Sequence, residues 1–92
     1  MRTPATLDRA TTDAILNRLK SIEGQARGIQ RMLEDGRECG QIMDQLAALR
    51  AATNAASMQA FEAFALHCLK DPETPIEDVV AQLISTVGKL SR

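Results

Sequence analysis

Two cysteines, Cys39 and Cys68, stand 29 positions apart in a stretch without proline, which predicts one unbroken helix over residues 37–69. A helix has 3.6 residues per turn and rises 1.5 Å per residue, so the thiols share one face to within roughly 20° and lie about 43 Å apart. That separation excludes a bond within one chain. If two such helices pack antiparallel about a two-fold axis, Cys39 of one copy meets Cys68 of the other, twice per dimer.

The middle of this helix favours the same arrangement. The midpoint of the cysteines falls between Thr53 and Asn54, within the small-residue run AATNAAS over residues 51–57. Small side chains allow two helix axes to approach closely, as a helix crossing its own symmetry mate requires. The alternative, that alanine is present simply as a good helix former, stays open.

Two further helices are expected, over residues 12–35 and 75–91. The first carries an apolar seam with alternating steps of four and three residues, and Gly36 favours its termination. The third is expected to be capped by Thr74, with Pro75 in the first turn. The fold class is therefore all-α: a three-helix subunit whose two long helices form an antiparallel hairpin. Residues 1–10 are expected to be a flexible arm and residues 11–92 a single domain.

Composition bounds the assembly and the compartment. Hydrophobic residues make up 45% of the 92 residues, and only Phe61 and Phe64 are aromatic. The long helices cannot bury their apolar faces within one small subunit, so we expect a homodimer and, from it, a tetramer. No apolar run approaches 18 residues and no leader is evident, which favours a cytoplasmic location without membrane contact. Unpaired cysteines in that compartment favour metal binding or redox chemistry.

The net charge of −1 gives no general argument for nucleic acid, but the first long helix is locally basic. Lys20, Arg27 and Arg31 lie within roughly 40° of one another, opposite the apolar seam. Repeated by assembly, this stripe would form a surface for the phosphates of double-stranded DNA, which Arg50 near the dyad could join, while Arg18 flanks the apolar seam. An ordinary solvated face is the alternative. No aromatic residues lie among these cations, which argues against stacking with single strands.

The sequence resembles the copper-sensitive operon repressors, the CsoR/RcnR family. The resemblance rests on RLKSIEGQARGI at residues 18–29, MLE at 32–34, EC at 38–39, DQLAALR at 44–50 and Cys68, and it covers most of the chain. It implies an antiparallel dimer, a dimer-of-dimers tetramer and operator binding without a helix-turn-helix, with Arg18 at a position implicated in operator contact. It also implies a repressor rather than an enzyme, released from DNA when an inducer reacts at an inter-subunit cysteine site.

The branches of this family differ in their inducer ligands. Copper sensors join an early cysteine to a histidine and a cysteine of the partner subunit, and these positions match Cys39, Phe64 and Cys68. Because phenylalanine cannot bind a metal, the resemblance favours the CstR-like, persulfide-sensing branch, with a small sulfane-sulfur inducer and no metal cofactor. The alternative is a copper(I)-responsive repressor that uses both thiolates. His67, roughly 80° around the helix from Cys39, would then be an auxiliary ligand.

Roles within the pair follow from position. Cys39 lies in the first helical turn beside Arg37, where the helix dipole and the cation favour thiolate, so it is expected to attack first. Cys68 would resolve the intermediate, and Phe64 would keep the site dry. A thiol-dependent enzyme such as a sulfur carrier is the rival class, but no general base stands in register with either cysteine. A structural adaptor with cysteines as core filler is a further alternative.

Overall fold

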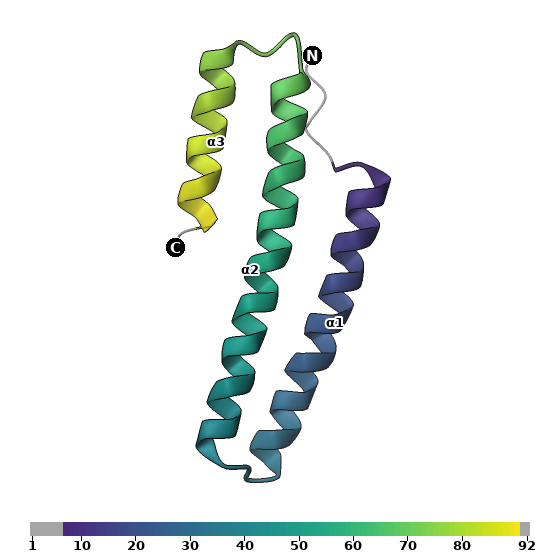
Figure 1. Ribbon diagram of the computed structural model, residues 1–92, viewed down its shortest axis with the longest axis vertical. Helices are drawn as coiled ribbons and strands as arrows, with labels where there is room; N and C mark the ends of the chain where they lie inside the picture. The colour runs from purple at the N-terminus through teal and green to yellow at the C-terminus, as the bar shows by residue number, and fades with distance from the viewer. Residues whose placement is uncertain (1–6, 91–92) are drawn as a thin grey trace.

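Three helices make up the part of the chain that the computed structural model describes, residues 7–90. They are α1 (Arg9–Glu34), α2 (Cys39–Lys70) and α3 (Ile76–Leu90). Figure 1 shows α2 in the middle, with α1 antiparallel along one side and the shorter α3 beside the C-terminal half of α2. The expected all-α subunit with a long antiparallel hairpin is confirmed.

The first helix begins earlier than the sequence predicted. Asp8 precedes it, and the Asp8 carbonyl accepts a hydrogen bond from the Thr12 N–H at 2.9 Å. Arg9 pairs with Asp13 one turn later, at 3.3 Å, which supports this start. Arg9 and Ala10 therefore belong to α1 and not to the expected flexible arm, of which residues 1–6 lie outside the described part.

The turn between α1 and α2 depends on Gly36, as the sequence predicted. Its φ is +68°, a left-handed conformation that L side chains avoid. The Gly36 N–H donates to the Leu33 carbonyl at 3.2 Å, and the Arg37 N–H donates to the Met32 carbonyl at 2.9 Å. This pattern closes the end of α1 and reverses the chain within a few residues.

The connection from α2 to α3 differs from expectation. The Thr74 hydroxyl donates to the Asp71 carboxylate, which also accepts the Glu73 N–H at 3.0 Å. The N–H groups of Asp78 and Val79, the third and fourth residues of α3, donate to the Pro75 carbonyl. The helix α3 begins at Ile76, directly after Pro75, so the prediction of Thr74 as its cap, with Pro75 in its first turn, was wrong.

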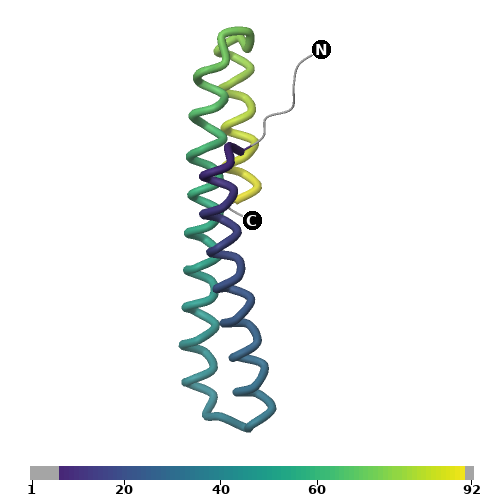
Figure 2. Tube along the Cα trace, turned by 90° about the vertical axis from the view of Figure 1, so that its right-hand side faces the viewer, coloured from purple at the N-terminus to yellow at the C-terminus, as the bar shows by residue number. Residues whose placement is uncertain are grey.

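A single copy of the chain buries very little. In the described residues the buried positions are Ile29, Ala56, Cys68 and Val79. The radius of gyration is 17.4 Å, whereas a globular chain of this length has about 12 Å. Figure 2 shows the resulting slender rod, in which α3 packs on α2 alone. Large apolar side chains remain exposed on all three helices: Leu16, Leu19, Leu33, Met43, Leu46, Met58, Leu66, Leu69, Ile76, Val80, Ile84, Val87 and Leu90.

None of these helices, over the residues described, combines the length and the apolar character needed to cross a membrane.

Replacement of Gly36 and of Gly24 by alanine should change stability in opposite directions. A Cβ at either position would meet no atom within 4 Å, so only backbone preference changes. Gly36→Ala should lower the free energy of unfolding by about 1–2 kcal/mol, because alanine disfavours positive φ. Gly24→Ala, within α1, should raise it by about 1 kcal/mol. Urea unfolding at one fixed protein concentration measures both, and a Gly36→Ala protein as stable as the parent would contradict the turn geometry.

Candidate functional site

The two cysteines mark the ends of α2. Cys39 is the first residue of this 32-residue helix and Cys68 lies two positions before its last residue. Because the helix is continuous, the thiols of one chain are separated by about 43 Å. Figure 1 shows the length of α2 that divides them. A site that contains both thiols therefore requires a second copy of the chain.

Cys39 is exposed at the start of α2. Glu38 caps the helix, and its Oε1 accepts the Gly40 N–H at 3.0 Å. The Arg37 Nε donates to the Gln41 Oε1 at 3.2 Å, so this guanidinium is engaged with a side chain other than Cys39.

Cys68 has the opposite environment. Its residue is 5% exposed, since α3 covers this half of α2. The Cys68 Sγ donates to the Gln82 Oε1 of α3 at 3.6 Å, and Val79 of the same helix is 2% exposed. Both cysteines share one face of α2, but α3 is too short to cover the Cys39 end. The pair is therefore chemically unequal within one chain.

The other residues proposed around the site are placed differently from one another. Phe64 is half-buried and stands one turn before Cys68 on α2. His67 is exposed and lines a shallow hollow with Asp8 and Lys70, near the start of α1. Within residues 7–90 of one chain, no three side chains of His, Cys, Asp or Glu come together as metal ligands would.

The proposed nucleic-acid contacts lie on the outer surface. Lys20, Arg31 and Arg50 are exposed. Arg27 pairs with Glu23 at 3.1 Å, and both side chains are about two-thirds exposed, 64% and 66%. Such a pair is worth little in water, so Arg27 can exchange this carboxylate for a phosphate.

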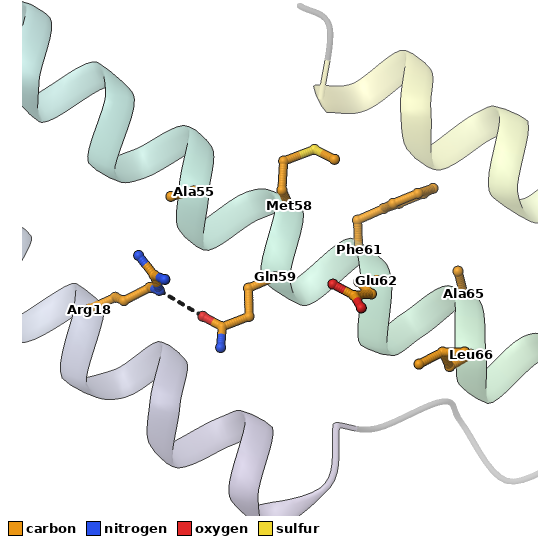
Figure 3. A pocket seen from close by; sticks show the side chains of 8 residues that line it. All are labelled: Arg18, Ala55, Met58, Gln59, Phe61, Glu62, Ala65 and Leu66. Atoms are coloured by element: carbon orange, nitrogen blue, oxygen red, sulfur yellow. Dashed lines mark hydrogen bonds between the residues drawn. The ribbon is translucent and has the colours of Figure 1, made fainter.

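Arg18 of α1 forms a hydrogen bond to α2 at the edge of an apolar groove. Its Nε donates to the Gln59 Oε1 of α2 at 2.8 Å, and Figure 3 shows the Gln59 side chain turned toward it. The groove has a volume of about 750 Å³ and includes Met58, which is 58% exposed, and Leu66, which is 48% exposed. Arg18 thus lies at the edge of apolar surface that one copy leaves uncovered.

Sequence reasoning missed two glutamines. Gln59 holds Arg18, and Gln82 contacts Cys68. The signal for Gln82 was present, since it stands three residues after Val79 and therefore on the apolar face of α3. A polar residue on such a face is informative because burial requires it to find a partner.

The arrangement defines a small helical protein with a divided thiol pair and a basic outer face, and comparison with known proteins identifies its family. A family model described as metal-sensitive transcriptional repressor matches residues 11–89. The chain therefore belongs to the metal-sensitive transcriptional repressors, the CsoR family, and it is not an enzyme.

Individual relatives agree with this assignment. The copper-sensing transcriptional repressor CsoR of Bacillus subtilis (strain 168) is 38% identical over 82 residues, 87% of this chain and 81% of the relative. The copper-sensing transcriptional repressor RicR of Mycobacterium tuberculosis (strain ATCC 25618 / H37Rv) is 32% identical over 57 residues, 62% of this chain and 59% of the relative. The crystal structure of the copper-sensing repressor CsoR with Cu(I) from Geobacillus thermodenitrificans NG80-2 has a TM-score of 0.82 and 34% identity. The similarity covers 99% of this chain and 95% of that one.

These comparisons confirm the family expected from the sequence but not the branch. The relatives just named are copper sensors, so the preference for a persulfide-sensing branch has no support from them. They favour the copper(I) alternative.

The two thiols should react at different rates with iodoacetamide in the folded protein. Cys39 is exposed, whereas Cys68 reacts only when α3 opens, so we expect Cys39 to be alkylated on the order of tenfold faster. Peptide mass spectrometry at timed quenches measures both rates, with urea-unfolded protein as the control in which the rates converge. Equal rates in the folded protein would contradict the placement of Cys68 beneath α3.

Proposed function

We propose that this chain is a repressor that binds operator DNA and is released when a thiophilic inducer joins Cys39 of one subunit to Cys68 of another. The observation that carries the proposal is the placement of two thiols on one face of α2, at its two ends, in a member of a repressor family. The two thiols of one chain are far apart along α2, so pairing with an antiparallel α2 of a second chain is the simplest way to bring Cys39 and Cys68 together.

The exposed apolar surface supports the required assembly. Leu46, Met58 and Leu66 of α2 are each more than 40% exposed in one copy. Burying a side chain of this kind contributes about 1.5–3 kcal/mol. A homodimer built on α2, extended to a tetramer through the remaining apolar faces, removes this surface from water.

Copper(I) is the inducer that the relatives favour. Thiolates are soft ligands that select copper(I) over harder cations, so the donor set of Cys39 and Cys68 fits this ion. Those two residues would hold it, and the ion would supply a bridge between subunits. His67 is exposed on a different side of α2, so the two thiolates are the principal ligands in this proposal.

Reactive sulfur is the second candidate, and Phe64 is the observation that favours it. Phe64 stands where the resemblance to copper sensors places a histidine, so the nitrogen ligand is missing. In this alternative the Cys39 thiolate attacks the sulfane sulfur of a persulfide, RSSH, and expels RS⁻ to leave Cys39 as a persulfide. The Cys68 thiolate then attacks the inner sulfur, forms the Cys39–Cys68 disulfide and expels hydrosulfide. The persulfide is the oxidant, so the electrons balance.

Titration of the DNA-bound protein distinguishes the two inducers. An operator is first selected from a random duplex library, and the complex is then titrated separately with copper(I) and with an organic persulfide under anaerobic conditions. Copper(I) should release DNA at about one ion per thiol pair, without covalent change in the intact mass.

Cys39→Ser should bind the operator like the parent and respond to neither inducer. Release of DNA by the persulfide alone, with a reducible cross-link between subunits, would replace the copper(I) proposal by the second candidate. A Cys39→Ser protein that still responds would place the site elsewhere.

The basic stripe on α1 should bind DNA phosphates. Lys20→Ala and Arg31→Ala should each weaken operator binding and reduce the slope of log K against log salt by about 0.9 for every phosphate that a subunit no longer neutralises. Lys89→Ala, at the far end of α3, is the matched control and should leave the slope unchanged. Fluorescence anisotropy across a salt series measures this, and unchanged slopes for both α1 variants would exclude the stripe.

A further inference from the structure

The buried thiol and one glutamine form a contact that the proposed function does not use. The Cys68 Sγ lies 3.6 Å from the Gln82 Oε1 and donates its proton to that oxygen. Cys68 comes from the end of α2, and Gln82 comes from the middle of α3. The contact therefore joins α2 to α3 across a chain reversal. A chemical change at the Cys68 sulfur would alter this contact between the two helices.

Contacts within α3 and between α3 and α2 fix the position of Gln82. Its backbone carbonyl accepts the Thr86 hydroxyl at 2.8 Å, and Val79, one turn earlier, is 2% exposed against α2. The helix α3 nevertheless packs on α2 alone and leaves Ile84 67% exposed, so its attachment is narrow. Elements with few buried contacts open locally at low cost in free energy.

We propose that Gln82 is a positioning residue that keeps the Cys68 thiol covered beneath α3 and so makes it the second of the two cysteines to react. The hydrogen bond exists only while the sulfur carries its proton. A sulfur that has given up its proton to bind a metal or to form a sulfur bridge has nothing to donate to a carbonyl oxygen. The Gln82 amide must then rotate its NH₂ group toward the sulfur or move away from it.

This arrangement would protect the site against adventitious reaction. Cys39 is exposed and meets an inducer first, while Cys68 becomes available only as α3 opens. A single-thiol reagent then modifies Cys39 well before Cys68, whereas an inducer able to join two sulfurs proceeds from Cys39 to Cys68. The inference deepens the proposed function and rests on it for this consequence, but the hydrogen bond and the cover are measured without inducer or DNA.

The test uses the Cys39→Ser protein, in which Cys68 is the sole thiol of the chain. The S–H stretching band in the Raman spectrum shifts to lower wavenumber when the thiol donates a hydrogen bond, so it reports the contact directly. In this background Gln82→Leu removes the acceptor but keeps a side chain over Cys68. Val79→Ala loosens the cover and keeps the acceptor, and Ser85→Ala is an exposed control on the same helix.

Gln82→Leu should move the band to higher wavenumber and raise the rate of iodoacetamide alkylation about 3- to 10-fold, the effect of removing one net hydrogen bond. Val79→Ala should raise the rate without moving the band, and Ser85→Ala should change neither. A band that stays in place in Gln82→Leu would overturn the hydrogen bond, and an unchanged rate would overturn its role in delaying reaction.

One measurement needs no second substitution. The band of the Cys39→Ser protein itself should lie below that of a cysteine thiol dissolved in a solvent without hydrogen-bond acceptors. A band at the solvent position would overturn the proposal even if Gln82→Leu failed to fold. Failure of the copper(I) and persulfide titrations, with the band behaving as expected, would instead remove the proposed function and leave the contact intact.

Discussion

The main physical constraint on this structure is that one copy of the chain buries few of its apolar side chains. Thirteen large apolar side chains are exposed in the described part of the chain, against four buried residues. Hydrophobic burial is the main favourable term in folding, and a rod of three helices in one layer cannot supply it alone. This shortage of buried apolar surface is the reason we propose association with further copies, and a site formed by that association would be coupled to stability.

The positions of the two cysteines on α2 relate the thiol site to subunit association. One helix carries both cysteines, so the same packing that covers α2 also decides whether the sulfurs meet. Because α3 reaches only one end of α2, the two thiols start in different environments, one open and one covered. In the proposed mechanism, an inducer that joins the two sulfurs would link the chemistry to the relative position of two subunits, and the basic stripe on α1 would move with those subunits. Linkage then requires DNA and inducer to oppose each other by one common free energy.

Much of the fold could be predicted from local pattern. The periodicity of the apolar residues and the absence of proline predicted the long helices, and Gly36 marked the turn between them. The start of α1 lies three residues earlier than predicted, at Arg9, directly after Asp8, a residue type that is common at N-cap positions. The role of Thr74 was missed because α3 begins one residue later than predicted, at Ile76, and the Thr74 hydroxyl donates to Asp71 in the preceding turn.

The chemistry of the site was less accessible from sequence. The burial of Cys68 and its contact with Gln82 depend on how α3 seats on α2, which is tertiary packing and leaves only a weak trace in the pattern. The inducer branch was inferred from Phe64 alone, whereas similarity over most of the chain favours the copper sensors. Phe64 is only one of the expected ligand positions, and the two cysteine thiolates by themselves suit copper(I), which is a soft ion. The identity of one residue was therefore too little to choose between the inducers.

The most direct test of the central claim is a cross-linking experiment with two single-cysteine proteins, Cys39→Ser and Cys68→Ser. Each is oxidised alone and after subunit exchange with the other, and the covalent dimers are quantified on non-reducing gels. We expect disulfide dimers only in the mixture, where a Cys39 from one subunit faces a Cys68 from another. Efficient dimers in either protein alone, or none in the mixture, would contradict the antiparallel pairing of α2.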